Sequence, residues 1–213
     1  MKYLSFFLSL SALVLIASCA KPEIIPEPDN SIDYRARFIG NVNGSEIEFT
    51  ENVDGMFCET EKLVDTIPNI PNSDSSFCVY FSQIKSRNAT NKQSVIIGLG
   101  WLELMPTISS TPALNQFEEF FEEYNTTNPE FVTLAENGVM VSYIDETGKV
   151  WTSEDGVAGE NFEFTAMEQV SDDTGDYLKF SAAFDCQLYW YDTAMVQSTI
   201  TIQGAEFDGV FKR

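Results

Sequence analysis

The sequence predicts a mainly β protein, built as a β-sandwich-like or open-barrel antiparallel domain with one short amphipathic helix. Apolar and polar side chains alternate along most segments from residue 32 onward, which is the pattern of half-buried strands. Turn signals recur between these segments about every ten residues, a spacing typical of sandwiches and open barrels. One segment departs from the alternation and carries aromatic residues at helical spacing instead.

The expected strands begin with a hairpin. Asn43-Gly44 is a strong hairpin signal, and it lies between the alternating segments 34–42 and 45–50. Gly98 and Gly100 fall within a later strand and indicate a bulge or a close approach of two backbones. The remaining expected strands are residues 77–84, 94–104, 138–145, 149–153, 161–169, 177–191, 196–203 and 206–211.

Segment 177–191 shows the alternation over the longest stretch. One face is apolar and is expected to lie in the core; it consists of Leu178, Phe180, Ala182, Phe184, Cys186, Leu188 and Trp190. The opposite face is mostly polar and is made of Lys179, Ser181, Asp185, Gln187, Tyr189 and Tyr191.

The one expected helix follows Thr111 and Pro112, which can cap a helix and occupy its first turn. Its aromatic face consists of Phe117, Phe120, Phe121 and Tyr124. Four glutamates cover the other face: Glu118, Glu119, Glu122 and Glu123. We expect the aromatic face to pack on the sheet, with a docking face for a partner as the alternative.

The first 31 residues predict export and anchoring. Residues 1–18 combine Lys2, a short apolar run and small residues before Cys19, as in a lipoprotein signal peptide with a lipobox. The run is shorter than the ~20 residues that a membrane-spanning helix needs. We expect a lipid on Cys19 to anchor the protein to a membrane. Residues 19–31, rich in proline and acidic residues, predict an extended tether, and residues 32–213 predict a single β-rich domain.

Charge and composition narrow the class of function. The formal net charge of −21 opposes nucleic acid as a partner. The chain has no histidine, which removes Ser-His-Asp and Cys-His catalysis and imidazole metal ligands. We therefore expect no cofactor and no metal, although catalysis by a pair of carboxylates stays open.

Three cysteines remain once Cys19 is assigned to the lipid. Cys58 and Cys78 flank a polar, proline-containing segment, so a disulfide between them is favoured, with Cys58–Cys186 as the alternative pairing. If the favoured pair forms, Cys186 is a buried free thiol, because it alternates with the core residues of its strand.

Two surface features are candidate binding sites. Tyr189 and Tyr191 lie on the polar face of their strand, where exposed rings could stack on sugars; cross-strand aromatic pairing is the alternative. The acidic run from Asp172 to Asp176 contains hard oxygen ligands for calcium, but its spacing differs from an EF-hand loop and favours a hairpin turn.

Three segments carry a resemblance to known proteins. They are residues 138–145 with 148–152, residues 184–189 (Phe-Asp-Cys-Gln-Leu-Tyr) and residues 204–211 (Gly-Ala-Glu-Phe-Asp-Gly-Val-Phe). In this order, and with the signal, the chain resembles small uncharacterised lipoproteins of Bacteroidota-type bacteria. The resemblance implies a β-rich extracytoplasmic domain and carries over no catalytic or binding residue.

These observations predict a lipid-anchored protein of the cell envelope, at the outer membrane and facing either the periplasm or the surface. We expect a non-catalytic binding module for a protein or a glycan. A carboxylate-dependent glycan hydrolase is one alternative, and a purely structural envelope lipoprotein is the other.

Overall fold

The computed structural model describes residues 32–66, 76–104, 111–132, 137–154, 157 and 159–213. Contacts between Cα atoms divide the chain into two units, Met1–Asn30 and Ser31–Arg213. The predicted signal peptide, Cys19 and the tether lie outside the described residues. Within the described part, no helix has both the length and the apolar character needed to cross a bilayer.

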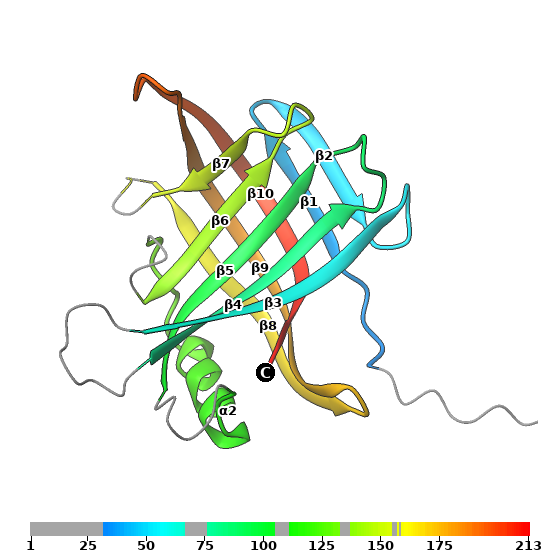
Figure 1. Cartoon of the computed structure of the whole chain (residues 1–213), viewed down its shortest axis with the longest axis vertical. Helices are drawn as coiled ribbons and strands as arrows, with labels where there is room; N and C mark the ends of the chain where they lie inside the picture. Colours follow the sequence, from blue (N-terminus) through cyan, green and yellow to red (C-terminus); the bar gives the residue numbers. More distant parts are fainter. Residues whose placement is uncertain (1–31, 67–75, 105–110, 133–136, 155–156, 158) are drawn as a thin grey trace, which may run out of the picture. The chain divides into compact units, whose positions relative to one another are not determined.

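The described residues form ten strands in a single antiparallel sheet (Figure 1). The sheet order is β2-β1-β10-β9-β7-β6-β5-β4-β3, and β8 pairs with β9 beside β7. The strands are β1 (Arg37–Val42), β2 (Ser45–Thr50), β3 (Met56–Thr66), β4 (Ser76–Ser86), β5 (Ser94–Leu104), β6 (Gly138–Ile144), β7 (Val150–Ser153), β8 (Asn161–Asp172), β9 (Gly175–Tyr191) and β10 (Gln197–Lys212).

The sheet curls into a nearly closed barrel, which confirms the mainly β prediction and selects the open-barrel form of it. The barrel closes where β3, the last strand of this order, and its neighbour β4 contact β10. At this seam the hydroxyl of Ser82 on β4 accepts a hydrogen bond of 3.2 Å from the backbone N–H of Val210 on β10. A side chain therefore bridges the strands here, where no backbone ladder joins them.

Aromatic rings fill the interior. The alternation predicted for 177–191 is confirmed from Leu178 to Leu188, whose inward residues are buried. Phe180 stacks on Phe207 at 5.8 Å and on Phe211 at 4.5 Å, measured between ring centroids. The interior is thus a packed core, as expected for a small barrel.

Helix α2 (Leu114–Glu122) and the short 3-10 turn η1 (Glu123–Asn125) lie at one end of the barrel (Figure 1). The packing prediction is confirmed, because the four aromatic residues of the predicted face are all buried. Phe117 meets Tyr80 of β4 at 5.4 Å, and Phe121 stacks on Phe211 of β10 at 5.6 Å. The helix begins later than predicted, with Ala113 as N-cap, because Gln116 folds back to accept the N–H of Ala113.

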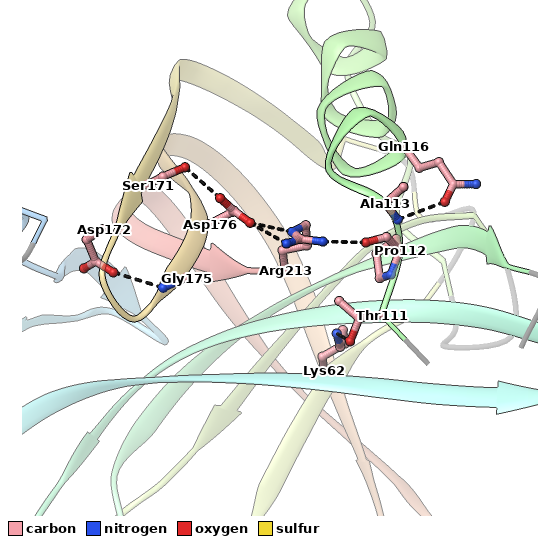
Figure 2. Close-up of polar contacts among 10 residues, drawn as sticks. All are labelled: Lys62, Thr111, Pro112, Ala113, Gln116, Ser171, Asp172, Gly175, Asp176 and Arg213. Atoms are coloured by element: carbon pink, nitrogen blue, oxygen red, sulfur yellow. Dashed lines mark hydrogen bonds and ion pairs between the residues drawn. The ribbon is translucent and has the colours of Figure 1, made fainter. Parts of the chain in front are cut away.

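A polar network joins the start of α2 to the strands beside it (Figure 2). The guanidinium of Arg213 donates to the carboxylate of Asp176 at 2.6 Å and to the carbonyl of Pro112 at 2.8 Å. Ser171 donates to the other oxygen of Asp176 at 2.8 Å. The ammonium of Lys62 on β3 donates to the hydroxyl of Thr111 at 3.3 Å. Strand β3, the β8–β9 hairpin and the helix start are therefore held together.

Two strand predictions needed correction. Strand β3 (Met56–Thr66) was not among the predicted strands. Strand β10 is continuous where two strands were predicted. Its register on β9 shifts between Ile202 and Ala205, and Gly204 takes a φ of +56° there, so a bulge replaces the predicted break.

Candidate ligand surface at the ends of β7 and β9

The candidate residues Tyr189 and Tyr191 lie near the end of β9, at the end of the barrel opposite α2 (Figure 1). Successive side chains of a strand point to opposite faces, so both tyrosines share the outer face and Trp190 between them faces inward. The strand turns into β10 immediately afterwards, through residues 192–196. The aromatic residues therefore gather at the rim of the barrel.

Tyr191 presents an exposed ring whose hydroxyl is held in place. The residue is 41% exposed. Its hydroxyl donates to a carboxylate oxygen of Glu154 at 2.6 Å and accepts from the amide of Gln197 at 2.9 Å. The bond to the carboxylate raises the pKa of Tyr191. The ring is thus pre-oriented, with polar groups on both sides of its hydroxyl.

Tyr189 is more enclosed than Tyr191. It lies between two strands, opposite Thr152 of β7 and Thr199 of β10. Both of these partners are threonines. Tyr189 therefore does not form a directly opposed aromatic pair, which was the alternative interpretation. Burial raises the pKa of Tyr189, and the charges of Glu160 and Glu154 add to this effect.

The inner side of the same rim holds two tryptophans and a lysine. Trp151 of β7 and Trp190 of β9 have ring centroids 6.3 Å apart. The ammonium of Lys149 lies 4.2 Å from the centroid of Trp190 and 5.4 Å from that of Trp151. The indole N–H of Trp151 donates to Asp145 at 3.0 Å. Sequence reasoning missed Lys149 and Trp151 as neighbours of Trp190, since the β7–β9 pairing is not visible along the chain.

Two carboxylates flank the tyrosines. Glu154 bonds to Tyr191, and Glu160 accepts the backbone N–H of Gln187 at 2.7 Å. Burial raises the pKa of Glu160. A carboxyl group with a raised pKa is one part of acid-base glycan hydrolysis, which also needs a second carboxylate at a defined distance.

The acidic run at Asp172 forms the β8–β9 hairpin turn, as the sequence favoured. One carboxylate oxygen of Asp172 accepts from the N–H of Thr174 at 2.7 Å and from that of Gly175 at 3.1 Å. The other accepts the N–H of Ile32 at 3.2 Å. Within the ranges the structure covers, no group of three or more acidic or cysteine side chains is placed to hold a metal ion.

The predicted Cys58–Cys78 disulfide is not formed, and all three described cysteines are free thiols. Cys58 pairs with Ile84 and Cys78 with Val64, so six register positions separate the two cysteines along β3 and β4. That is about 20 Å along the strands, against the 4.4–6.8 Å between Cα atoms that a disulfide requires. Cys186 is buried in the core, and burial raises its pKa well above the usual value.

Comparison of the chain with protein families, curated proteins and solved structures gave no match. The resemblance to small envelope lipoproteins therefore stays a prediction.

Proposed function

We propose that this protein is a lipid-anchored module of the cell envelope that binds a glycan without changing it, at the rim formed by Tyr189, Tyr191 and their neighbours. The anchoring part of the proposal comes from the lipobox ending in Cys19. The binding part comes from the surface at the ends of β7 and β9.

The binding proposal rests on the exposure of Tyr191 and on the two hydrogen bonds of its hydroxyl. A large aromatic ring is left 41% exposed while its hydroxyl is fixed between Glu154 and Gln197. An exposed, pre-oriented ring can stack on the apolar face of a sugar, and the adjacent carboxylate and amide can bond its hydroxyls. The ordering cost of binding is small when the groups are already in place.

A carboxylate-dependent hydrolase is the second candidate, favoured by the raised pKa of Glu160 and by the charges of Glu160 and Glu154 that both act on Tyr189. Against it, Glu160 already accepts a backbone hydrogen bond from Gln187, which gives this side chain a structural task. We therefore place the hydrolase second.

A glycan-array screen of the full-length protein in detergent tests the proposal. We expect at least one envelope-type glycan to bind, and Tyr191→Ala to weaken it about tenfold through the loss of stacking. Tyr191→Phe keeps the ring and should retain most of the affinity. Val196→Ser, at a 59% exposed position in the adjacent turn, is the control and should bind as wild type does.

Three outcomes would count against the proposal. Equal binding by wild type and Tyr191→Ala would remove the rim as the site. Cleavage of a bound glycan, abolished by Glu160→Gln, would establish the hydrolase instead. Failure to bind any glycan would favour a protein-binding or purely structural envelope lipoprotein.

A further inference from the structure

A second surface, on the outer face of β3 to β6, is apolar where the outside of a barrel is ordinarily polar. It contains a groove of about 280 Å³. Its apolar part is formed by Leu63, Phe81, Ile96 and Met140, and its acidic part by Glu59 and Glu61. We refer to it as the β3–β6 groove.

One row of residues across four strands builds the groove. Register pairing places Glu61 of β3 opposite Phe81 of β4, Phe81 opposite Gly98 of β5, and Gly98 opposite Met140 of β6. Directly opposite residues lie on the same face of the sheet. The row therefore begins at the acidic residue Glu61 and continues through Phe81 and Gly98 to Met140.

Gly98 is required at the centre of this row. A Cβ atom there would lie 2.9 Å from a ring carbon of Phe81 and 3.3 Å from the terminal methyl of Met140. The missing side chain allows the ring and the thioether to converge over the backbone. The approach to Gly98 is made by two side chains and not by a second backbone, as was predicted, and these side chains line the groove with apolar atoms.

The charges at the groove are acidic and partly uncompensated. Glu59 forms an ion pair with Lys85 on β4. The carboxylate of Glu61 has no hydrogen bond or ion pair with any residue that the structure describes. Leu63, two positions further along β3, is 43% exposed. An exposed apolar side chain and an unpaired carboxylate thus lie side by side on one face.

We propose that the β3–β6 groove docks a protein segment in which an apolar side chain is flanked by lysine or arginine. The apolar side chain enters the groove between Leu63, Phe81 and Ile96, and a basic side chain meets the carboxylate of Glu61. The formal net charge of −21 favours a basic partner over an acidic one and speeds its approach. This inference does not rest on the glycan site, which lies on β7 and β9.

The test uses the full-length protein in detergent and two synthetic hexapeptides, one alternating Lys with Leu and one alternating Glu with Leu. Binding is followed by fluorescence anisotropy. We expect the Lys-Leu peptide to bind and the Glu-Leu peptide not to bind. Glu61→Lys and Leu63→Ser should each weaken the Lys-Leu peptide about tenfold, and the first variant should also reduce the salt dependence.

The matched control is Glu119→Lys, which makes the same change of charge at an exposed position on α2. It should bind the Lys-Leu peptide within about twofold of wild type. Equal losses in Glu61→Lys and Glu119→Lys would show attraction by net charge alone and overturn the proposal. No binding by wild type would also overturn it.

Sedimentation of the same variants tests whether a second copy of this chain occupies the groove in place of a basic partner. If wild type dimerises and Leu63→Ser is monomeric, a second copy of this chain occupies the groove and the basic partner is wrong. Circular dichroism of each variant establishes that it is folded, and both substitutions lie at solvent-facing positions of β3.

Discussion

Arg213 shows how much one side chain can connect in this barrel. It reaches both Asp176 on β9 and the carbonyl of Pro112 before α2 (Figure 2). Its side chain is 28% exposed and that of Asp176 is 20% exposed, so the pair is shielded more than an ordinary surface ion pair. Nothing in the sequence pattern signalled this contact, since the two residues are far apart along the chain.

Asp176 predicts a specific loss of stability in acid. The hydrogen bond from Ser171, and then the one from Arg213, lower its pKa from the ordinary value of 3.8. A group with a lowered pKa in the folded state stabilises the fold above its unfolded pKa, and this contribution is lost as the pH falls from 3.8 through the lower folded value. We expect Asp176→Asn to cost about 1–2 kcal/mol at neutral pH and to flatten the acid limb of the stability curve.

Urea unfolding across the acid range measures this effect. Arg37→Gln is the control, since Arg37 and Glu48 form an exposed pair at 3.6 Å that should contribute little. A variant at Asp176 with the same acid sensitivity as wild type would show that another carboxylate controls it.

The cysteines give a second prediction at the scale of residues. Burial raises the pKa of Cys78 to about 11 and raises that of Cys186 well above its usual value, so both thiols should resist alkylation in the folded protein. After denaturation without reductant, mass spectrometry should find Cys58, Cys78 and Cys186 all alkylated. A pair that stays unmodified until reductant is added would contradict the free thiols.

At the scale of elements, the sequence predicted those strands that alternate clearly and missed the one that does not. The inward positions of β3 include Thr60 and Lys62, and its outward positions include Glu59 and Glu61. An edge strand with polar residues on both faces lacks the two-residue signal. Its assignment needs the pairing with β4, which only the folded chain supplies.

The candidate rim was predicted in part for a similar reason. Tyr189 and Tyr191 were identified because alternation within one strand determines their face. Lys149 and Trp151 reach Trp190 only through the pairing of β7 with β9, a contact between segments about forty residues apart. The helix start was misplaced because the N-cap is Ala113 and not Thr111, and Gln116 in the first turn accepts the N–H of Ala113.

The helix itself yields a stability prediction. Phe121 is 1% exposed and packs on Tyr80 and Phe211, so Phe121→Ala should lower the free energy of unfolding by about 3–5 kcal/mol. Leu114→Ala, on the same helix at 41% exposure, should cost less than about 0.5 kcal/mol. The urea concentrations at the unfolding midpoints of the two variants should therefore differ strongly. Equal midpoints would mean that α2 does not close the core.

At the scale of the whole molecule, the interior is packed with side chains, so a partner must bind to the outer surface. The barrel is filled by aromatic side chains, and α2 covers one end (Figure 1). The features that could meet a partner are the rim at β7 and β9 and the β3–β6 groove. The glycan proposal assigns the rim to an envelope component, which the folded unit can reach only if it is exported and held at a membrane.

The central claim is therefore the lipid on Cys19, and detergent-phase partitioning of the protein made in a bacterium that processes lipoproteins tests it most directly. We predict that wild type enters the detergent phase at the size of the mature, acylated protein, and that Cys19→Ser is not acylated and keeps the larger size of the chain with its signal uncleaved. Partitioning of Cys19→Ser into the detergent phase with the size of mature wild type would contradict the claim.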